Sequence, residues 1–282
     1  MPVKIFFLHL IKIGQHKSGL LSFIFLILLI LLYIFSLLFS WGPYEKNMDA
    51  LLKPPDINHL FGTDRMGRDQ LSRVILAIPV AFYLPILSVF ISLVIGSLMG
   101  VLAGYYGSYC ERVLMWFNDI LLAVPALLLA IFIVGVFGNG IINTAIAISL
   151  IYIPRFGRIA RGSTRSIINY AFIDSAKLSS VSDFTIFFRH VIPNIFPELL
   201  VMAMISFSTA LVAQSALSFL GLGIIPPTPD LGNMIAKSIK LVSIAPWMLL
   251  CPAIVLSMII MFFNLFGDAI RDLYDPKISS YV

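Results

Sequence analysis

Side chains that could carry out catalysis or bind a metal ion are few and scattered in this sequence. The 282 residues contain no phosphate-binding loop of the GxxxxGK(S/T) type, no HExxH zinc motif and no nucleophile elbow. The two cysteines, Cys110 and Cys251, have no metal-ligand spacing. The histidines are far apart along the chain: His9, His16, His59 and His190. We therefore predict no catalytic residue, no metal site and no cofactor bound by this chain.

Two carboxylates in apolar surroundings, Asp119 and Glu198, are the candidates for a proton or ion relay. Transporters driven by ion gradients usually keep such groups in the middle of the membrane. Both residues instead lie near the ends of their apolar segments, so we interpret them as interfacial residues that pair with local basic groups or backbone. A chain with almost no charge inside its apolar segments is typical of a transporter driven by a separate ATPase.

One polar, partly basic segment separates two long apolar runs. Residues 172–193 read FIDSAKLSSVSDFTIFFRHVIP. A segment of this composition does not lie in lipid, because the bilayer cannot solvate its polar groups. The pattern favours a helix-turn-helix on the cytosolic surface, offered to another protein. We predict that this segment receives the mechanical work that drives the protein.

The composition indicates an integral membrane protein. The chain is 60% hydrophobic and only 12% charged, whereas an average soluble domain has about 25% charged residues. The bilayer is therefore the expected solvent of the apolar surface. The formal net charge of +5 is read as a topology signal, not as a nucleic-acid-binding surface.

Six apolar runs are the expected membrane spans, each needing roughly 20 residues to cross. They cover residues 19–40, 74–110, 113–136, 141–153, 193–223 and 241–267. The second run is longer than a span requires, so we expect it to tilt, kink or extend beyond the membrane. Pro79 and Pro85 are expected to kink this helix or to delay its start. Phe137 to Gly140 form a short external turn.

The distribution of charge predicts that both termini lie in the cytosol. Three lysines precede the first run, and between residues 155 and 189 six basic residues face two acidic ones. Excess Lys and Arg mark cytosolic loops. Residues 41–74 carry five basic and five acidic residues, a balance expected of an external loop, and the PPTP sequence at 226–229 begins another.

Three glycines recur at every fourth position of the second run: Gly96, Gly100 and Gly104. This spacing places them on one helix face, where small residues let two backbones approach closely. We expect this face to pack within the subunit, with contact to a second membrane subunit as the alternative.

Several motifs follow one another along nearly the whole chain. The first motif, at 61–73, is FGTDRMGRD followed by LSR, and it resembles LGTDxxGRDxLSR. The second comprises ALSFLGLG at 216–223, PPTP at 226–229 and GNM at 232–234. The third is NLFGDAIRD at 264–272, followed by DP at 275–276. In this order, and with ERVLMWFNDILLAVPALLLAI at 111–131, the motifs resemble the inner-membrane permeases of binding-protein-dependent ABC importers. The branch is the one that carries dipeptides, oligopeptides and nickel, and the chain resembles its "C"-type subunit. The loop motif residues are Gly62, Thr63, Asp64, Gly67, Arg68 and Asp69.

The resemblance implies an all-α integral membrane fold, with six transmembrane helices forming an ABC transporter type 1 (MetI-like) transmembrane domain. We place that domain at 76–270, after an N-terminal segment, first helix and external loop at 1–75 and before a cytosolic tail at 271–282. It also implies that residues 172–193 are the EAA coupling loop, normally EAAxxxG. The proposed contact residues are Asp174, Ser175, Ala176, Lys177, Ser180, Asp183, Arg189 and Pro193.

This segment departs from the family pattern at three points, one of which is Ser175 in place of the first alanine. Asp174 replaces the glutamate but keeps an acid in the first turn of the helix, where the helix dipole favours negative charge. Ser180 replaces the glycine, and serine lacks the freedom of glycine to adopt positive φ. We therefore expect the turn between the two short helices to be the place where the geometry differs.

The resemblance also implies the partners. They are a second, homologous permease, two cytosolic ATPases that use ATP and Mg²⁺, and an external substrate-binding protein, all at a bacterial inner membrane. We predict a non-enzymatic permease subunit that forms half of a pore for di- or oligopeptides. A permease for nickel or a metal chelate is the first alternative. A secondary transporter or channel and a non-transporting scaffold are the distant ones.

Overall fold

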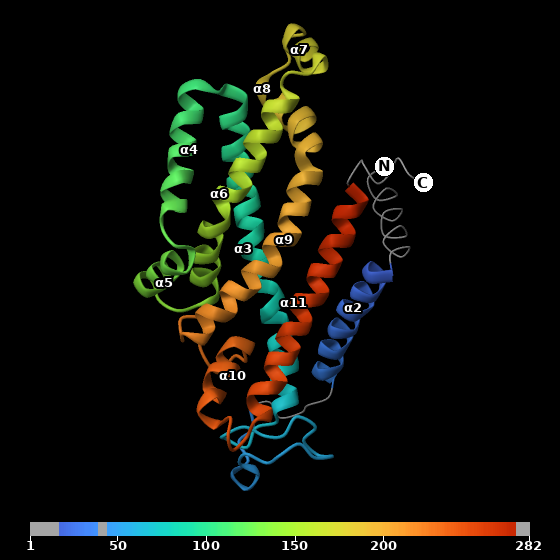
Figure 1. Ribbon diagram of the computed structural model, residues 1–282, viewed down its shortest axis with the longest axis vertical. Helices are drawn as coiled ribbons and strands as arrows, with labels where there is room; N and C mark the ends of the chain where they lie inside the picture. Colours follow the sequence, from blue (N-terminus) through green and yellow to red (C-terminus); the bar gives the residue numbers. More distant parts are fainter. Residues whose placement is uncertain (1–16, 39–43, 275–282) are drawn as a thin grey trace.

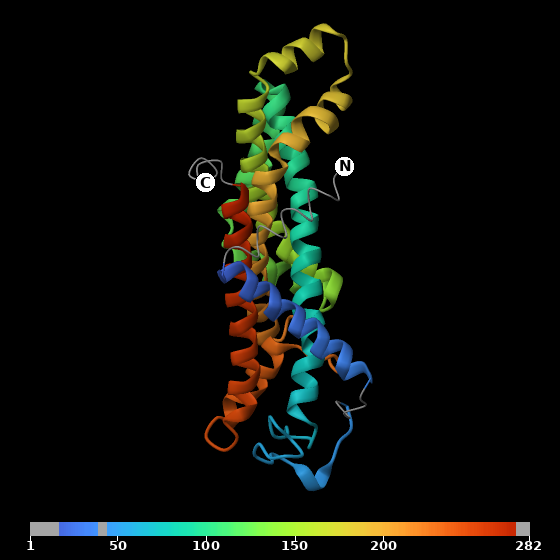
Figure 2. The same cartoon turned by 90° about the vertical axis from the view of Figure 1, so that its right-hand side faces the viewer.

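Helices account for all regular structure in the residues that the computed structural model describes, 17–38 and 44–274. The long helices run side by side along the molecule, except the first, α2, which crosses the others obliquely (Figures 1 and 2). They are α2 (Lys17–Leu38), α3 (Gln70–Tyr106), α6 (Ile141–Ile167), α9 (Ile192–Phe219) and α11 (Trp247–Tyr274). The predicted all-α fold is therefore confirmed for these residues. The N-terminal segment 1–16 and the tail 275–282 lie outside the described residues, and the predicted boundaries after residues 75 and 270 fall inside α3 and α11.

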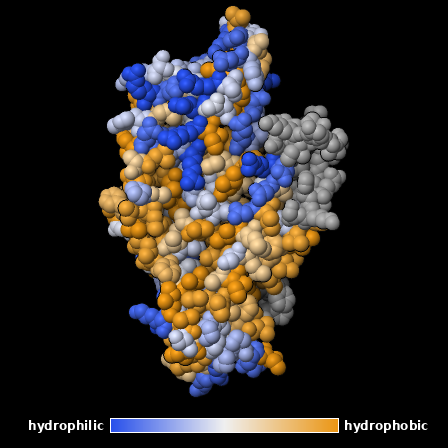
Figure 3. Space-filling view, in the orientation of Figure 1, coloured by the Kyte–Doolittle hydropathy of each residue, from blue (hydrophilic) through white to orange (hydrophobic). Residues whose placement is uncertain are grey.

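Three helical stretches are long and apolar enough to cross a membrane: Gln70–Tyr106, Asp183–Phe219 and Trp247–Asp272. A bent pair, Ser108–Ala123 and Ala126–Phe137, adds a fourth span if the pair crosses as one, and Gly19–Ile34 is a shorter apolar stretch. The surface agrees with this assignment, because Figure 3 shows a broad apolar region beneath a hydrophilic end. The described helices thus give three or four spans by length and composition.

The expected third span is not a continuous helix. Residues 113–136 are divided between α4 (Ser108–Ala123) and α5 (Ala126–Phe137), which meet at 91°. Val124 at the break is extended, with φ −89° and ψ 131°, as expected of a residue that precedes proline. Pro125 also has no N–H to donate to the preceding turn. Residues 113–136, expected to form one span with Pro125 inside it, are therefore bent at Pro125, and they count as one span if both helices cross together.

The start of α3 also differs from the prediction. Pro79 and Pro85 both lie inside the helix, so neither delays its start. The helix begins at Gln70 because Asp69 caps it, with Oδ2 accepting a hydrogen bond from the Ser72 backbone N–H at 2.8 Å. Proline is tolerated within apolar helices of this kind, where neighbouring groups satisfy the freed backbone.

Two further helices extend through segments that were expected to be loops. The fourth apolar run was expected to end near residue 153, but α6 continues to Ile167 and carries four arginines of the basic segment, Arg155, Arg158, Arg161 and Arg165. The expected external loop after PPTP contains α10 (Leu231–Ser238) and a 3₁₀ turn (Ile239–Leu241), and α11 begins at Trp247 instead of residue 241. Hydropathy predicts where a helix is apolar and not where it ends.

The close packing of α3 on α6 is built on the three regularly spaced glycines. A Cβ added at Gly100 would lie 2.3 Å from the Gly157 carbonyl oxygen and 2.6 Å from the Ala160 Cβ. The corresponding distances are 2.5 Å from Gly96 to the Ile153 oxygen and 2.9 Å from Gly104 to the Arg161 oxygen. The glycine face therefore packs inside this chain.

Candidate functional site

The polar segment forms a helical hairpin at one end of the molecule. It contains α7 (Ala171–Leu178), a turn, α8 (Asp183–Ile186) and a π-helical turn (Phe187–Val191) that continues into α9. The hairpin projects beyond the long helices, at the end opposite to the loop of residues 44–69 (Figures 1 and 2). We call α7, the turn and α8 the end hairpin.

The turn of the end hairpin is a Schellman motif. The Ser180 N–H donates to the Lys177 carbonyl at 3.0 Å, and the Val181 N–H donates to the Ala176 carbonyl at 3.2 Å. Ser180 adopts φ 55°, the left-handed conformation that glycine adopts freely. We expected serine to change the geometry of this turn. The backbone φ does not follow that expectation, because Ser180 takes the glycine-like value at an energetic cost.

Restoring glycine at this position is expected to stabilise the chain. In Ser180→Gly, relief of the left-handed conformation outweighs the extra freedom of glycine in the unfolded chain, by roughly 0.5 to 1 kcal/mol. Thermal unfolding in detergent measures this change. The matched control is Ser179→Gly, since Ser179 has φ −80° and gains nothing from glycine. A gain in the control equal to that in Ser180→Gly would contradict the prediction.

The end hairpin has a buried face and an exposed face. Ile173 is fully buried, and Ala176 and Val181 pack against the same core cluster. Large apolar side chains of the hairpin are exposed, namely Phe172, Leu178 to 87% and Phe184 to 69%, and so is Phe188 in the π-helical turn that follows. Ala176, predicted as a contact residue, thus faces mainly the chain's own core. Exposed apolar side chains on a polar helix outside the apolar region are typical of a protein-docking surface.

A pair of tyrosines fastens the end hairpin to the end of α3. The Tyr105 hydroxyl donates to Asp183 Oδ1 at 2.7 Å, and the Tyr106 hydroxyl donates to Asp183 Oδ2 at 3.0 Å. The Lys177 amine lies 5.1 Å from the centre of the Tyr105 ring, and both rings meet Phe187 edge-on. We call this the tyrosine clasp. Neither tyrosine was predicted from the sequence, since nothing there links them to a residue 77 or 78 positions away.

The remaining residues predicted for this segment are exposed. Asp174 lies in the first turn of α7, Ser175 donates its hydroxyl to the Ala171 carbonyl at 2.9 Å, and Arg189 lies in the π-helical turn. Pro193 lies in the first turn of α9, a position where the missing N–H of proline does no harm. The structure therefore brings the predicted residues to one end of the molecule, on different faces of it.

Ion pairs join α6 to α4 at the same end. Arg161 and Arg165 bind the two oxygens of Glu111 at 3.0 and 3.3 Å, and Arg158 binds Asp119 at 2.9 Å. Glu198 accepts a hydrogen bond from the Ser163 hydroxyl. Asp119 is paired and mostly exposed, which fits an interfacial residue better than a buried ion relay.

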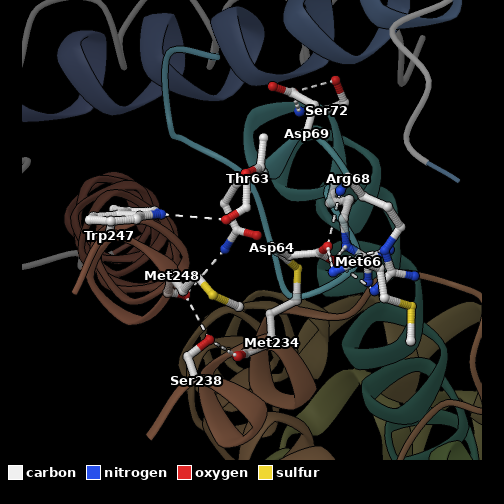
Figure 4. Close-up of polar contacts among 12 residues, drawn as sticks. Thr63, Asp64, Met66, Arg68, Asp69, Ser72, Met234, Ser238, Trp247 and Met248 are labelled. Atoms are coloured by element: carbon white, nitrogen blue, oxygen red, sulfur yellow. Dashed lines mark hydrogen bonds and ion pairs between the residues drawn. The ribbon is translucent and has the colours of Figure 1, made fainter. Parts of the chain in front are cut away.

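The loop motif, at the opposite end, is a compact network of hydrogen bonds and ion pairs. Figure 4 shows the Asp64 carboxylate at its centre. The carboxylate accepts hydrogen bonds from the Met66 and Arg68 backbone N–H groups at 2.8 and 3.0 Å, and from Arg68 Nε at 2.7 Å. Arg73 Nε lies 3.6 Å from the same carboxylate. Thr63 is fully buried and its hydroxyl donates to the Ala50 carbonyl.

The two glycines of the motif are required by geometry. Gly62 and Gly67 both have φ 68°. A Cβ at Gly67 would lie 1.7 Å from the Asn47 oxygen, and one at Gly62 would lie 2.7 Å from Trp247 Nε1. Two residues that were not predicted as site residues complete this network. Trp247 Nε1 donates to the Thr63 carbonyl at 3.5 Å, and Gln70 Nε2 donates to the Met248 carbonyl at 3.1 Å. The motif thus ties the start of α3 to the start of α11.

The chain belongs to the family described as the binding-protein-dependent transport system inner membrane component, whose family model matches residues 96–280. In fold it is similar to a chain of the methionine ABC transporter MetNI in an inward-facing conformation. That match has a TM-score of 0.59 and 14% identity, and it covers 72% of this chain and 97% of the other.

Several relatives are similar over almost the full length. The dipeptide transport system permease protein DppC of Alkalihalophilus pseudofirmus is 34% identical over 95% of this chain and 89% of its own length. The glutathione transport system permease protein GsiD of Escherichia coli O6:K15:H31 is 38% identical over 94% and 88%. The di/tripeptide transport system permease protein DppC of Pseudomonas aeruginosa is 36% identical over 94% and 90%. The resemblance seen in the motifs is therefore confirmed.

Proposed function

We propose that this chain is a permease subunit of an ATP-driven importer and forms half of a pore for small peptides. The names of its relatives support peptides, because two of the three act on di- or tripeptides and the third on glutathione, itself a small peptide. None of these three relatives is a nickel permease, so peptides are favoured over nickel or a metal chelate. The family description places its members in an inner membrane.

The end hairpin carries the mechanical part of this proposal. It lies at the hydrophilic end of the molecule, beyond the apolar region (Figures 1 and 3), presents exposed apolar side chains and is fastened to α3 by the tyrosine clasp. A rigid element of this kind can transmit motion from an ATPase to the helices that cross the membrane.

In the full proposal the chain has six spans with both termini in the cytosol, pairs with a second permease and binds no cofactor. Two ATPases that use ATP and Mg²⁺ dock at the cytosolic end, and a binding protein delivers peptide at the other.

Leu178→Glu tests the docking surface. Because Leu178 is 87% exposed, a charge there is harmless to the fold of this chain, whereas an ATPase groove would have to bury it. Retention of co-expressed ATPase subunits on a column carrying the permease is expected to fall about tenfold, a modest loss for an unpaired charge in an interface.

The matched control is Ile57→Glu, at an equally exposed apolar residue in the loop at the other end, 96% exposed. This variant is expected to retain the ATPases. Full retention with Leu178→Glu would show that the end hairpin is an ordinary solvated segment.

A further inference from the structure

A crevice at the end opposite to the end hairpin carries an excess of positive charge over negative charge. It lies between the loop motif, the start of α3 and α10, and has a volume of about 280 Å³, near the lower limit of typical small-molecule sites. Four cationic side chains line it against one carboxylate, Asp64. These side chains are Arg65, Arg68, Arg73 and Lys237.

Part of this positive charge has no acidic partner within residues 17–38 and 44–274. Arg68 binds Asp64 through Nε and Nη2, and its Nη1 has no partner among the described residues. Lys237 likewise makes no ion pair with a described residue. Partial withdrawal from water, together with the charges of Arg73 and Arg68, lowers the pKa of Lys237. The crevice therefore presents the remaining guanidinium N–H groups of Arg68 and the amine of Lys237 to an incoming anion.

The second acid near the crevice does not neutralise it. Asp230 lines an adjoining pocket that shares Arg68, Arg73 and Lys237 with the crevice. It is 3% exposed, and burial raises its pKa. Its carboxylate is also occupied, since Oδ1 accepts the Asn233 N–H at 2.9 Å and Oδ2 accepts from Gln214 Nε2 at 3.3 Å. Asp230 holds the start of α10 in place and leaves the cations facing the opening.

The apolar part of the lining is made of methionine. Met66, Met234 and Met248 all contribute to the wall. Methionine side chains are flexible and polarizable, and they adapt to ligands of different shape. The C-terminal end of a short peptide has a constant carboxylate and a variable side chain. The cationic groups of the crevice suit the carboxylate, and the adaptable apolar wall suits the side chain.

We propose that this crevice binds the C-terminal carboxylate of a small peptide, with the terminal side chain against the three methionines. This inference rests on the proposed function, and it assigns a substrate subsite to the permease itself. The loop motif then has a second role beyond holding α3 and α11, because Asp64 orients Arg68 toward the opening.

The test is acylation of Lys237 in the full chain in phosphatidylcholine nanodiscs, followed by mass spectrometry. Saturating dialanine, at about ten times its Kd, is expected to slow acylation of Lys237 about tenfold, because only the unoccupied fraction reacts. Lys240, exposed two residues beyond the end of the same helix, is the internal control and should not change. The C-terminal amide of dialanine, which lacks the carboxylate, should not protect.

Three results would overturn the inference. They are absence of protection by dialanine, equal protection by its amide, and protection without peptide in nanodiscs that contain phosphatidylglycerol, which would assign the crevice to a lipid headgroup. The measurement needs no ATPase and no transport. Its failure would leave the docking of the ATPases, tested by Leu178→Glu, unaffected.

Discussion

Replacing Gly100 with leucine is expected to destabilise the folded chain strongly. The added Cβ alone would lie 2.3 Å from the Gly157 oxygen and 2.8 Å from the Arg161 nitrogen. Both contacts are with backbone, so no side-chain rotation can relieve them. The helices must separate, and overpacking of this kind costs about 3 kcal/mol or more. The midpoint of thermal unfolding in detergent, and the yield of monodisperse protein, should both fall.

The control is Gly162→Leu on the facing helix α6. An added Cβ there meets nothing within 4 Å, and leucine is a better helix former than glycine. This variant should unfold at the parental temperature or above it. Equal stability of Gly100→Leu and the parent would mean that α3 and α6 are not in contact through the glycine face.

The sequence predicted the helices better than their ends. Apolar runs locate α3, α9 and α11 because lipid-facing helices need continuous apolar residues. The same rule cannot find the end of α6, since its final turns leave the apolar region and are held by pairs such as Arg161–Glu111. The 91° bend before α5 depends on a single residue, Pro125, whose effect on a run of apolar residues does not appear in hydropathy.

The site was predictable where composition carries the signal. A polar segment between apolar runs identifies the end hairpin, and the glycine spacing identifies the face of α3 that meets α6. The tyrosine clasp and the cationic crevice were not predictable, since each joins residues far apart in the chain. Lys237 and Arg68, for example, line one crevice because α10 packs beside the start of α3 and the loop motif folds back on it.

Removing the tyrosine clasp is expected to separate ATPase docking from transport. In the double variant Tyr105→Phe and Tyr106→Phe the rings that pack against Phe187 remain, but Asp183 loses both hydroxyl donors. The exposed face of the end hairpin is unchanged, so the ATPases should still be retained. Motion of the hairpin is no longer passed firmly to α3, and peptide uptake should fall on the order of tenfold, within the usual range of coupling between sites.

Tyr109→Phe is the matched control, because Tyr109 is 75% exposed and its hydroxyl has no partner among the described residues. That variant should transport at the parental rate. The informative comparison is with Leu178→Glu, which should lose both ATPase retention and transport, whereas the clasp variant should lose transport alone. If the double phenylalanine variant imports peptide as fast as the parent, the end hairpin moves the membrane helices through its continuity with α9, and the clasp to α3 has no part in coupling.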